Sequence, residues 1–357
     1  MSVESKETFS VTLIGAGCAS LSLAARADEF DGYEFTVLEH STHQAEDHTW
    51  GFWAMPWLSH VKESTKKTWN NWQIISKDQI AELSSINHPY CAISRHSWLK
   101  QCRLRAEKFR IRFTTDLHEQ TAQQIFDSRP PTPPANAMFQ HFLGHEISTS
   151  YDVFNPNTAI LMDFRCDQSL GMHFIYCLPF TKRSALIEST MFSAELAPKA
   201  FYEKAISQYL RKIFNCNNFV TTRTEQGVIP LAFGQQHDSE FTGIGANGGA
   251  IRPSSGYAFT FIHKQIDRMI RTARRGQPLQ VKSPHSWFEL FMDHVFLNVI
   301  RRQPKLAPTI FIGLAKALTG DEFALFLSGK AGLKLWLKVV FAMPKGPFLF
   351  ALVASIR

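Results

Sequence analysis

Short apolar runs alternate with polar segments along most of this chain, and the first two runs lie close together near the N-terminus. Residues Val11–Ile14 form one run, a glycine-containing turn follows at Gly15–Ser20, and an apolar helical pattern continues to Arg26. The second run, Phe35–Leu38, ends at Glu39. This order predicts a buried strand, a tight turn, a helix and a second buried strand that is followed by an acid.

Such a strand–turn–helix–strand unit is typical of dinucleotide binding. The first glycine allows the tight turn, the second lets the backbone approach a pyrophosphate at the helix N-terminus, and an acid about 20 residues on binds the ribose hydroxyls. Glu39 follows Ser20, the third position of the motif, by nineteen residues. An ordinary strand-to-helix turn without a nucleotide is the alternative. The cofactor-binding candidates in this unit are Gly15, Ala16, Gly17, Ala19, Ser20 and Glu39.

The middle of the chain has a different pattern, in which apolar and polar residues tend to alternate with the period of a β-strand. The predicted strands of this second sheet are Gln140–Glu146, Ala159–Phe164, Met172–Pro179 and Ser184–Phe192. Residues 57–90 alternate more weakly and are expected to add strands to a second sheet, and Lys108–Phe113 is also predicted as a strand. The polar and aromatic stretch Glu46–Trp53 is predicted as a ligand-facing loop, and most of the last eighty residues as helices.

Composition narrows the class of protein. With 45% apolar and 19% charged residues, the 357-residue chain is globular, and its 13% aromatic content suits either a large apolar ligand or a phenylalanine-rich core. The net charge of +7 favours an anionic membrane surface, because no nucleic-acid-binding signature accompanies it. The six cysteines and fourteen histidines show no metal-ligand spacing, and no apolar run reaches the ~18–20 residues that a transmembrane helix needs.

A second glycine cluster lies two-thirds of the way along the chain, at Gly243–Ala250, and is followed by Ile251–Tyr257. Closely spaced glycines let backbone N–H groups approach a ligand, and a helix beginning after Ser254 would direct its dipole toward it. Two such clusters fit a flavin, with one for the adenosine diphosphate end and one for the isoalloxazine end. A glycine-rich surface loop is the alternative. The candidates here are Gly245, Gly248, Gly249, Ser255 and Gly256.

At this point the chain resembles the lycopene cyclases of the bacterial carotenoid type, a branch of the FAD-binding monooxygenase-like superfamily. The stretches that carry the resemblance, in order, are Gly15–Ser20, His48–Trp50, Met162–Asp163, Leu178–Phe180, Ala185–Thr190, Glu225–Pro230, Gly248–Tyr257 and Phe341–Pro344. The chain departs from the usual pattern at Ser20, Ala246 and Ser189.

The resemblance implies an α/β fold with a Rossmann-like FAD-binding domain, an interwoven β-sheet substrate domain and a helical C-terminal region. The expected division assigns residues 1–56, 91–130 and 240–275 to the FAD-binding domain, 57–90 and 137–239 to the substrate-binding sheet domain, and 276–357 to the C-terminal region.

The resemblance also implies a set of site residues. Cyclisation of a polyene end needs a proton donor, and a carboxyl group in apolar surroundings keeps its proton because burial raises its pKa. Glu188 is the expected acid, with Asp163 and Glu225 as secondary candidates; a strand glutamate, a turn residue and a cap are the plainer alternatives. His48, Thr49 and Arg95 are expected near the flavin. Ring faces that could stabilise a cation belong to Trp50, Phe52 and Trp53.

The C-terminal stretch Glu322–Arg357 contains apolar runs that lysines interrupt. This pattern suits a segment at a membrane interface, although a helix that covers the core would look similar. The expected location is the cytoplasm, peripherally on the inner face of the cell membrane.

The expected function is that of a lycopene beta-cyclase which uses reduced FAD, with NAD(P)H as external reductant and no net redox change. The alternatives are an FAD-dependent monooxygenase or oxidoreductase acting on a hydrophobic substrate, and a non-catalytic carotenoid-binding relative.

Overall fold

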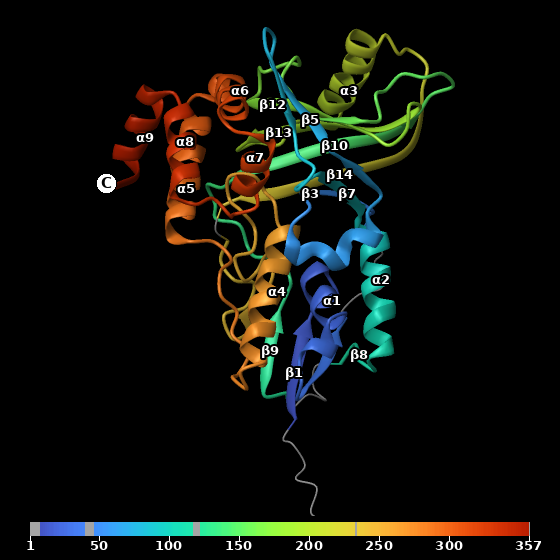
Figure 1. Cartoon of the computed structure of the whole chain (residues 1–357), viewed down its shortest axis with the longest axis vertical. Helices are drawn as coiled ribbons and strands as arrows, with labels where there is room; N and C mark the ends of the chain where they lie inside the picture. Colours follow the sequence, from blue (N-terminus) through green and yellow to red (C-terminus); the bar gives the residue numbers. More distant parts are fainter. Residues whose placement is uncertain (1–7, 40–45, 117–121, 233, 357) are drawn as a thin grey trace, which may run out of the picture.

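A parallel five-stranded sheet forms the lower part of the molecule in Figure 1, in the strand order β15-β9-β1-β2-β8. The computed structural model describes residues 8–39, 46–116, 122–232 and 234–356. The strands of this sheet are β1 (Phe9–Ile14), β2 (Tyr33–Leu38), β8 (Arg112–Thr114), β9 (Gln124–Asp127) and β15 (Thr242–Gly243). Its helices are α1 (Cys18–Ala24), α2 (Arg95–Lys108) and α4 (Phe259–Ala273), with the short 3-10 turn η1 (Ala27–Glu29) after α1.

Packing explains why the N-terminal runs fold as predicted. Val11, Leu13 and Val37 are at most 1% exposed and pack in one cluster with α1 and α4. Parallel strands are covered on both faces, so their sequences are nearly continuous apolar runs. The prediction of strand, turn, helix and strand is confirmed here. Lys108–Phe113 is corrected, because α2 continues to Lys108 and β8 begins only at Arg112.

A seven-stranded sheet forms the upper part of the molecule, with the order β14-β10-β13-β12-β11-β5-β6. All of its pairings are antiparallel except that of β11 with β5. The strands are β5 (Asn71–Ile75), β6 (Ile80–Ser84), β10 (Met138–Ser148), β11 (Thr158–Asp163), β12 (Met172–Pro179), β13 (Ser184–Ser193) and β14 (Val220–Leu231). Helix α3 (Lys199–Phe214) packs on one face of this sheet, which leaves the other face for the site.

A third, three-stranded sheet connects the two larger ones. Its strands are β3 (Thr49–Trp53), β4 (Lys67–Trp69) and β7 (Tyr90–Ser94), in the order β3-β7-β4. The predicted loop over Glu46–Trp53 is therefore wrong from Thr49 onward, because cross-strand pairing with β7 extends those residues. The weakly alternating region 57–90 also divides: η2 (Pro56–Ser64) is a 3-10 segment, and only β5 and β6 join the large sheet.

The C-terminal region is helical, as predicted, and lies beside the large sheet (Figure 1). It contains α5 (Trp287–Arg302), η3 (Pro304–Leu306), α6 (Ala307–Ala317), α7 (Gly320–Leu327), α8 (Leu333–Ala342) and α9 (Lys345–Ile356). Among the described residues, none of the helices alone has the length and apolarity to cross a membrane; only α8 and α9 taken together do, and they are bent by 116° at their junction. The division into domains given above stays a prediction.

Candidate active site

Four residues form a row across the large sheet, on the face opposite α3. In the antiparallel register Tyr176 of β12 lies opposite Glu188 of β13, which lies opposite Gly144 of β10, which lies opposite Glu225 of β14. Directly opposed residues point to the same face of a sheet. The pairing therefore brings two glutamates, 37 positions apart in the sequence, to either side of one glycine.

Gly144 is what allows the two glutamates to approach each other. A Cβ at this position would lie 3.1 Å from Cγ of Glu225, 3.1 Å from Cδ1 of Leu186 and 3.4 Å from Cβ of Glu188. Glycine inside a strand weakens it and marks a place where another group comes close. The sequence-based prediction missed this residue, although a glycine inside the apolar alternation of β10 was the signal that could have found it.

Glu225 is a buried carboxylate held by several donors. Its Oε2 accepts hydrogen bonds from the backbone N of Thr49 (3.0 Å), from Oγ1 of Thr49 (3.1 Å) and from Nη1 of Arg223 (2.6 Å). Burial raises the pKa of Glu225, while the Arg223 charge and the Thr49 donors oppose that rise. Its Oε1 has no hydrogen-bond partner among the described residues.

Glu188 lies in a more apolar environment and has fewer donors. Its Oε1 accepts a hydrogen bond from Oγ1 of Thr190 at 2.6 Å. Burial raises the pKa of Glu188 to about 8, and the neighbouring charge of Glu225 adds to the rise. Glu188 is therefore the carboxyl of the pair that holds a proton at neutral pH, which is the state that a general acid requires.

The Glu188 side chain lines a cavity between the two large sheets, which we call the carboxylate cavity. Its empty volume is about 1240 Å³, open solvent at its mouth included. The lining residues include Cys18, His48, Thr49, Trp50, Gly51, Tyr90, Phe142, Tyr176, Glu188, Ser255, Gly256, Tyr257, Ala258 and Phe259. The cavity thus extends from the first turn of α1 to the proton-bearing carboxyl.

The N-terminal turn has the shape that a dinucleotide needs. Gly15 has a φ of +89°, and a Cβ there would lie 2.9 Å from Oγ of Ser128, so only glycine fits this turn. A Cβ on Gly17 would meet no atom within 4 Å, which leaves its backbone open to a pyrophosphate. Glu39 follows β2 and pairs with Nη1 of Arg103 at 2.7 Å. These residues fit the adenosine diphosphate part of FAD.

Two other members of the N-terminal motif, Ala19 and Ser20, are 5% and 0% exposed, so their side chains pack inside the protein. A small buried residue at the third position of the motif lets helix and strand pack closely. Ala19 also packs against Gly245 of the second glycine cluster. A Cβ on Gly245 would lie only 2.5 Å from Cβ of Ala19, so a side chain there would collide with α1. Arg95 begins α2 and lies near Cys18, where its charge lowers the pKa of the thiol against the stronger effect of burial.

The second glycine cluster divides into a packing part and a cavity part. Gly248 packs against the backbone of its own turn, because a Cβ on Gly248 would lie 2.5 Å from the carbonyl oxygen of Gly243. Gly249 has a φ of +75°, a conformation that favours glycine. Of the candidates in this cluster, only Ser255 and Gly256 line the carboxylate cavity. The predicted helix after Ser254 is also corrected, because a turn occupies the next residues and α4 begins at Phe259.

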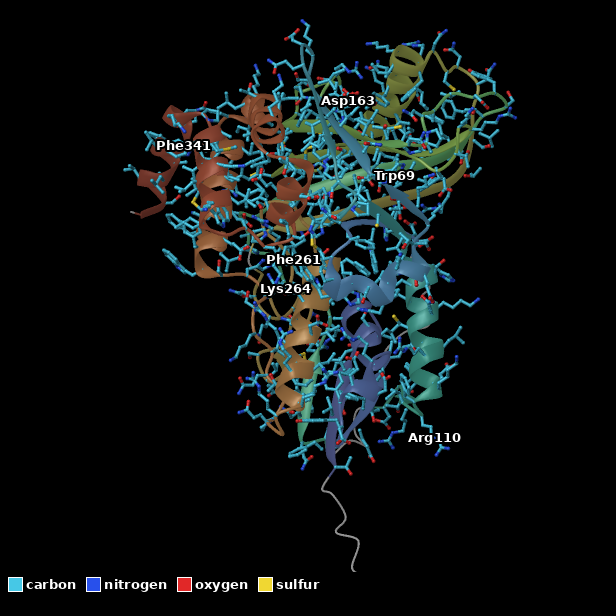
Figure 2. The ribbon with its side chains drawn as sticks, viewed as in Figure 1. Trp69, Arg110, Asp163, Phe261, Lys264 and Phe341 are labelled. Atoms are coloured by element: carbon cyan, nitrogen blue, oxygen red, sulfur yellow. The ribbon has the colours of Figure 1, made fainter. Side chains whose placement is uncertain are left out.

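The structure does not place Asp163, a secondary candidate for the acid, in the wall of the carboxylate cavity. Asp163 is fully buried, pairs with Arg165 at 2.6 Å and accepts a hydrogen bond from the Tyr209 hydroxyl of α3 at 2.9 Å. It therefore belongs to the α3 face of the sheet, and its position there can be followed in Figure 2. Its ion pair is structural.

The remaining candidates are His48, which was expected near the flavin, and the aromatic residues of β3, which were expected to stabilise a cation. His48 lines the cavity, and its Nε2 lies 2.8 Å from the carbonyl oxygen of Gln226. Trp50 lines the same cavity, whereas Phe52 is buried against Phe259 and Trp53 faces a different cavity. Among the described residues no group of three or more His, Cys, Asp or Glu could hold a metal ion.

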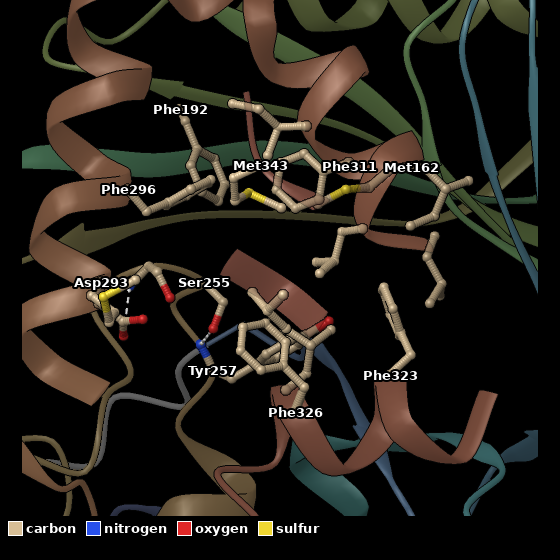
Figure 3. Close-up of a pocket in the computed structure, with 18 of the residues that line it drawn as sticks. Met162, Phe192, Ser255, Tyr257, Asp293, Phe296, Phe311, Phe323, Phe326 and Met343 are labelled. Carbon is tan, nitrogen blue, oxygen red and sulfur yellow. Dashed lines mark hydrogen bonds between the residues drawn. The ribbon is translucent and has the colours of Figure 1, made fainter. Parts of the chain in front are cut away.

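That different cavity lies between the sheet face and the C-terminal helices, and we call it the helical cavity. Its empty volume is about 930 Å³, open solvent included. Figure 3 shows its aromatic and thioether lining, which includes Phe192, Phe296, Phe311, Phe323, Phe326 and Met343. A cavity of this lining suits an apolar ligand.

Comparisons with known proteins find similarity to lycopene cyclases along most of the chain. The sequence profile described as "Lycopene cyclase protein" matches residues 10–348. The lycopene beta-cyclase of Pantoea ananas is 23% identical, over 97% of each chain. The lycopene beta-cyclase of Paracoccus sp. (strain N81106 / MBIC 01143) is 26% identical, over 73% of this chain and 72% of its own.

Solved structures confirm the predicted fold class. A geranylgeranyl bacteriochlorophyll reductase-like protein of Thermoplasma acidophilum superposes with a TM-score of 0.60 at 10% identity, over 98% of this chain and 99% of its own. HpxO of Klebsiella pneumoniae, solved with FAD and uric acid, gives 0.57 at 11% identity, over 97% and 100%. A flavin-dependent brominase variant gives 0.57 at 13% identity, over 93% and 97%. At these identities the likeness concerns the fold alone.

Proposed function

This chain belongs to the lycopene cyclase family, and from that premise we propose that it converts the acyclic ends of lycopene to β-ionone-type rings. The observation that carries the proposal is Glu188, a carboxyl that holds a proton at neutral pH in the wall of a largely apolar cavity. The reaction is an isomerisation, because one proton is added to the polyene and one is lost.

In the proposed reaction Glu188 donates its proton to the terminal double bond. A neighbouring double bond then attacks the resulting cation and closes the ring, and loss of a ring proton forms the product. Glu225, which accepts hydrogen bonds from Arg223 and Thr49, lies beside Glu188, and its charge raises the pKa of Glu188 and so favours return of the proton to it. The ring face of Trp50, which lines the cavity, stabilises cationic character by roughly 0.5–2 kcal/mol.

The proposed cofactor is FAD, which Gly15, Gly17, Glu39, Ser255 and Gly256 would hold. In its reduced form the cofactor would supply electrostatic support for a cation or a source of a proton. NAD(P)H is proposed as the external reductant that primes it, without stoichiometric consumption.

The direct test is pigment analysis of a lycopene-accumulating bacterial host that expresses this chain. Cyclic carotenoid would support the proposal. Unchanged lycopene with soluble, flavin-loaded protein would contradict it and favour an oxidoreductase, for which stoichiometric consumption of NAD(P)H is the signature. Unchanged lycopene with flavin-free protein would favour a carotenoid-binding relative that lacks turnover.

The rate of cyclisation should depend on pH through Glu188. Because the acid acts in its protonated form and burial raises its pKa to about 8, kcat/KM should be flat below that pH. Above it, the rate should fall about tenfold per pH unit. The measurement is a pH–rate profile with flavin kept reduced throughout; a rate that rises between pH 7 and 9 would contradict the assignment of Glu188 as the acid.

The same shift predicts how stability depends on pH. Between the usual value of 4.5 and about 8, the folded protein keeps the Glu188 proton that the unfolded chain has lost. Stability therefore falls as pH rises through this window. Glu188→Gln should remove this contribution, measured as a flatter dependence of the denaturation midpoint on pH; an unchanged slope would contradict the raised pKa.

We also propose that the C-terminal helices contact a membrane surface, since lycopene dissolves in lipid. Helices α8 and α9 expose Leu333, Leu337, Val340, Phe341, Leu349, Phe350 and Val353, which we call the apolar tail surface. Phe341 is 73% exposed and lies at the outer side of these helices in Figure 2. Exposed lysines on the same helices, Lys334, Lys338 and Lys345, suit anionic headgroups. The proposed location is the inner face of the cell membrane.

Removing apolar groups from this surface should weaken membrane binding. Replacing Phe341, Leu349 and Phe350 together by serine should lower binding to anionic liposomes by at least about tenfold, because burying each such side chain contributes about 1.5–3 kcal/mol. Co-sedimentation measures the effect. The matched control replaces the exposed Ile86, Leu170 and Leu196 by serine and should bind normally. Equal binding by all three proteins would overturn the membrane proposal.

A further inference from the structure

The carboxylate cavity and the helical cavity are neighbours that share part of their walls. Tyr176, Ser255 and Tyr257 line both of them. Figure 3 shows Ser255 and Tyr257 at the edge of the helical cavity, where the backbone N of Tyr257 lies 3.5 Å from Oγ of Ser255. The side chains of Tyr176 and Tyr257 and the short loop at Ser255 therefore lie between the cavity of the proton donor and the more apolar helical cavity.

The helical cavity is suited to an uncharged ligand. Most of its lining is aliphatic or aromatic. The charged side chain in it is Asp293, whose charge is balanced by an ion pair with Arg252. Asp293 pairs with the buried Arg252 at 3.2 Å and lies 3.5 Å from the backbone N of Ser254. A ligand in this space would meet ring faces and thioether groups but no unbalanced charge.

Three tyrosines lie near this boundary: Tyr176 and Tyr257 line both cavities, and Tyr90 lines the carboxylate cavity. Tyr176 stands directly opposite Glu188 in the sheet, and the charge of Glu188 affects the titration of Tyr90, Tyr176 and Tyr257 alike. Burial raises the pKa of Tyr257 to about 12 and those of the other two well above the usual value. All three therefore remain neutral phenols, which present ring faces and hydroxyl donors beside the acid.

The outer end of the helical cavity is formed by the same helices that carry the apolar tail surface. Trp336 and Val339 of α8, Met343 just after α8, and Phe348 of α9 line the cavity from that side. Apolar side chains therefore lie both on the exposed face of α8 and α9 and along the walls of the helical cavity, as far as Tyr176 and Tyr257.

We propose that the helical cavity binds the part of a long polyene that is not reacting, and that Tyr176 and Tyr257 form the threshold across which one end of the chain reaches Glu188. The inference rests on the proposed function, since that function makes the ligand a polyene. Its consequence is selectivity for length: a full-length substrate fills both cavities, whereas a short one with the same terminal units needs only the carboxylate cavity.

Filling the helical cavity tests this assignment. In the full chain with bound flavin, the double replacement Leu314→Phe and Val339→Phe narrows the cavity from α6 and α8. We expect kcat/KM for lycopene to fall at least about tenfold, mainly through KM, while a truncated acyclic polyene with the same end group keeps its value within about twofold. The matched control makes the same exchanges at exposed positions, Leu104→Phe and Val220→Phe, and should leave both substrates unaffected.

Equal losses on both substrates, or no loss on lycopene, would overturn the inference. Flavin retention shows that each variant is folded. If the double variant loses flavin, Met343→Trp fills the helical cavity from another lining position and repeats the test. Binding is measured separately in a Glu188→Gln background, as lycopene that stays with the protein through gel filtration; the filled cavity should retain at least about tenfold less. If the wild type binds lycopene in this way but makes no ring, the proposed function fails while the cavity assignment stands.

Discussion

Glu188→Gln is expected to abolish ring formation, with a loss in kcat of at least about 10²-fold, because general acid catalysis typically contributes 10²–10⁴-fold. The amide has the same shape and can still accept the hydrogen bond from Thr190, but it has no proton to give. The protein should remain folded and keep its flavin, since the exchange removes a carboxyl that is already neutral at pH 7. Product analysis by chromatography, beside flavin absorbance, measures both properties.

The matched control for that variant is Glu82→Gln, an exposed glutamate of β6 in the same sheet. It should cyclise at the wild-type rate. If Glu188→Gln retained more than about a tenth of the activity, Glu188 would not be the principal acid. Glu225→Gln should then lower the activity more than Glu188→Gln does, and the proton donor would be Glu225, on the other side of Gly144.

Gly144→Val is the second change with a large expected effect. A branched side chain would enter the gap between Glu188 and Glu225, where even a Cβ lies only 3.1–3.4 Å from its neighbours. Displacing a catalytic group by about 1 Å can cost about 10²-fold in rate, and overpacking a core costs about 1–3 kcal/mol of stability. We expect a loss of about 10²-fold in kcat and a lower melting temperature.

The control for this change lies at the next residue of the same strand. His145 is half-buried, and its side chain lies on the α3 side, near Glu203. His145→Val is a similar substitution in the same strand but on the other face, so cyclisation should be largely kept. Gly144→Ala should be intermediate. If Gly144→Val were fully active with an unchanged pH–rate profile, the close approach of the two carboxyls would not matter to the reaction.

Local patterns in the sequence were sufficient for much of the fold. Val11–Ile14 and Phe35–Leu38 read as buried strands because parallel strands are covered on both faces, and Gly15 and Gly17 indicated the turn between them. The antiparallel strands β12 and β13 and the helical C-terminus could also be predicted, because the spacing of apolar residues along the chain differs between strands and helices. Glu188 was distinguished by its apolar strand together with the family resemblance.

Other features depend on contacts between residues far apart in the chain, which no local pattern records. Thr49–Trp53 looked like a loop, but pairing with β7 makes it a strand whose first residue holds Glu225. Asp163 was a secondary candidate for the acid, yet a β-strand alternates its faces and pairing places this residue on the side of α3.

The sequence by itself therefore determined the N-terminal strand–turn–helix–strand unit and most strands of the second sheet, and with the family resemblance it singled out Glu188 as the candidate acid. Only the tertiary structure decided which carboxyl stands beside that acid, because strand register aligns Glu188 and Glu225 across Gly144. It also decided that two cavities meet at Tyr176 and Tyr257. The physical reason is that local propensity depends on neighbours in the sequence, whereas the pKa of a carboxyl and the walls of a cavity depend on neighbours in space.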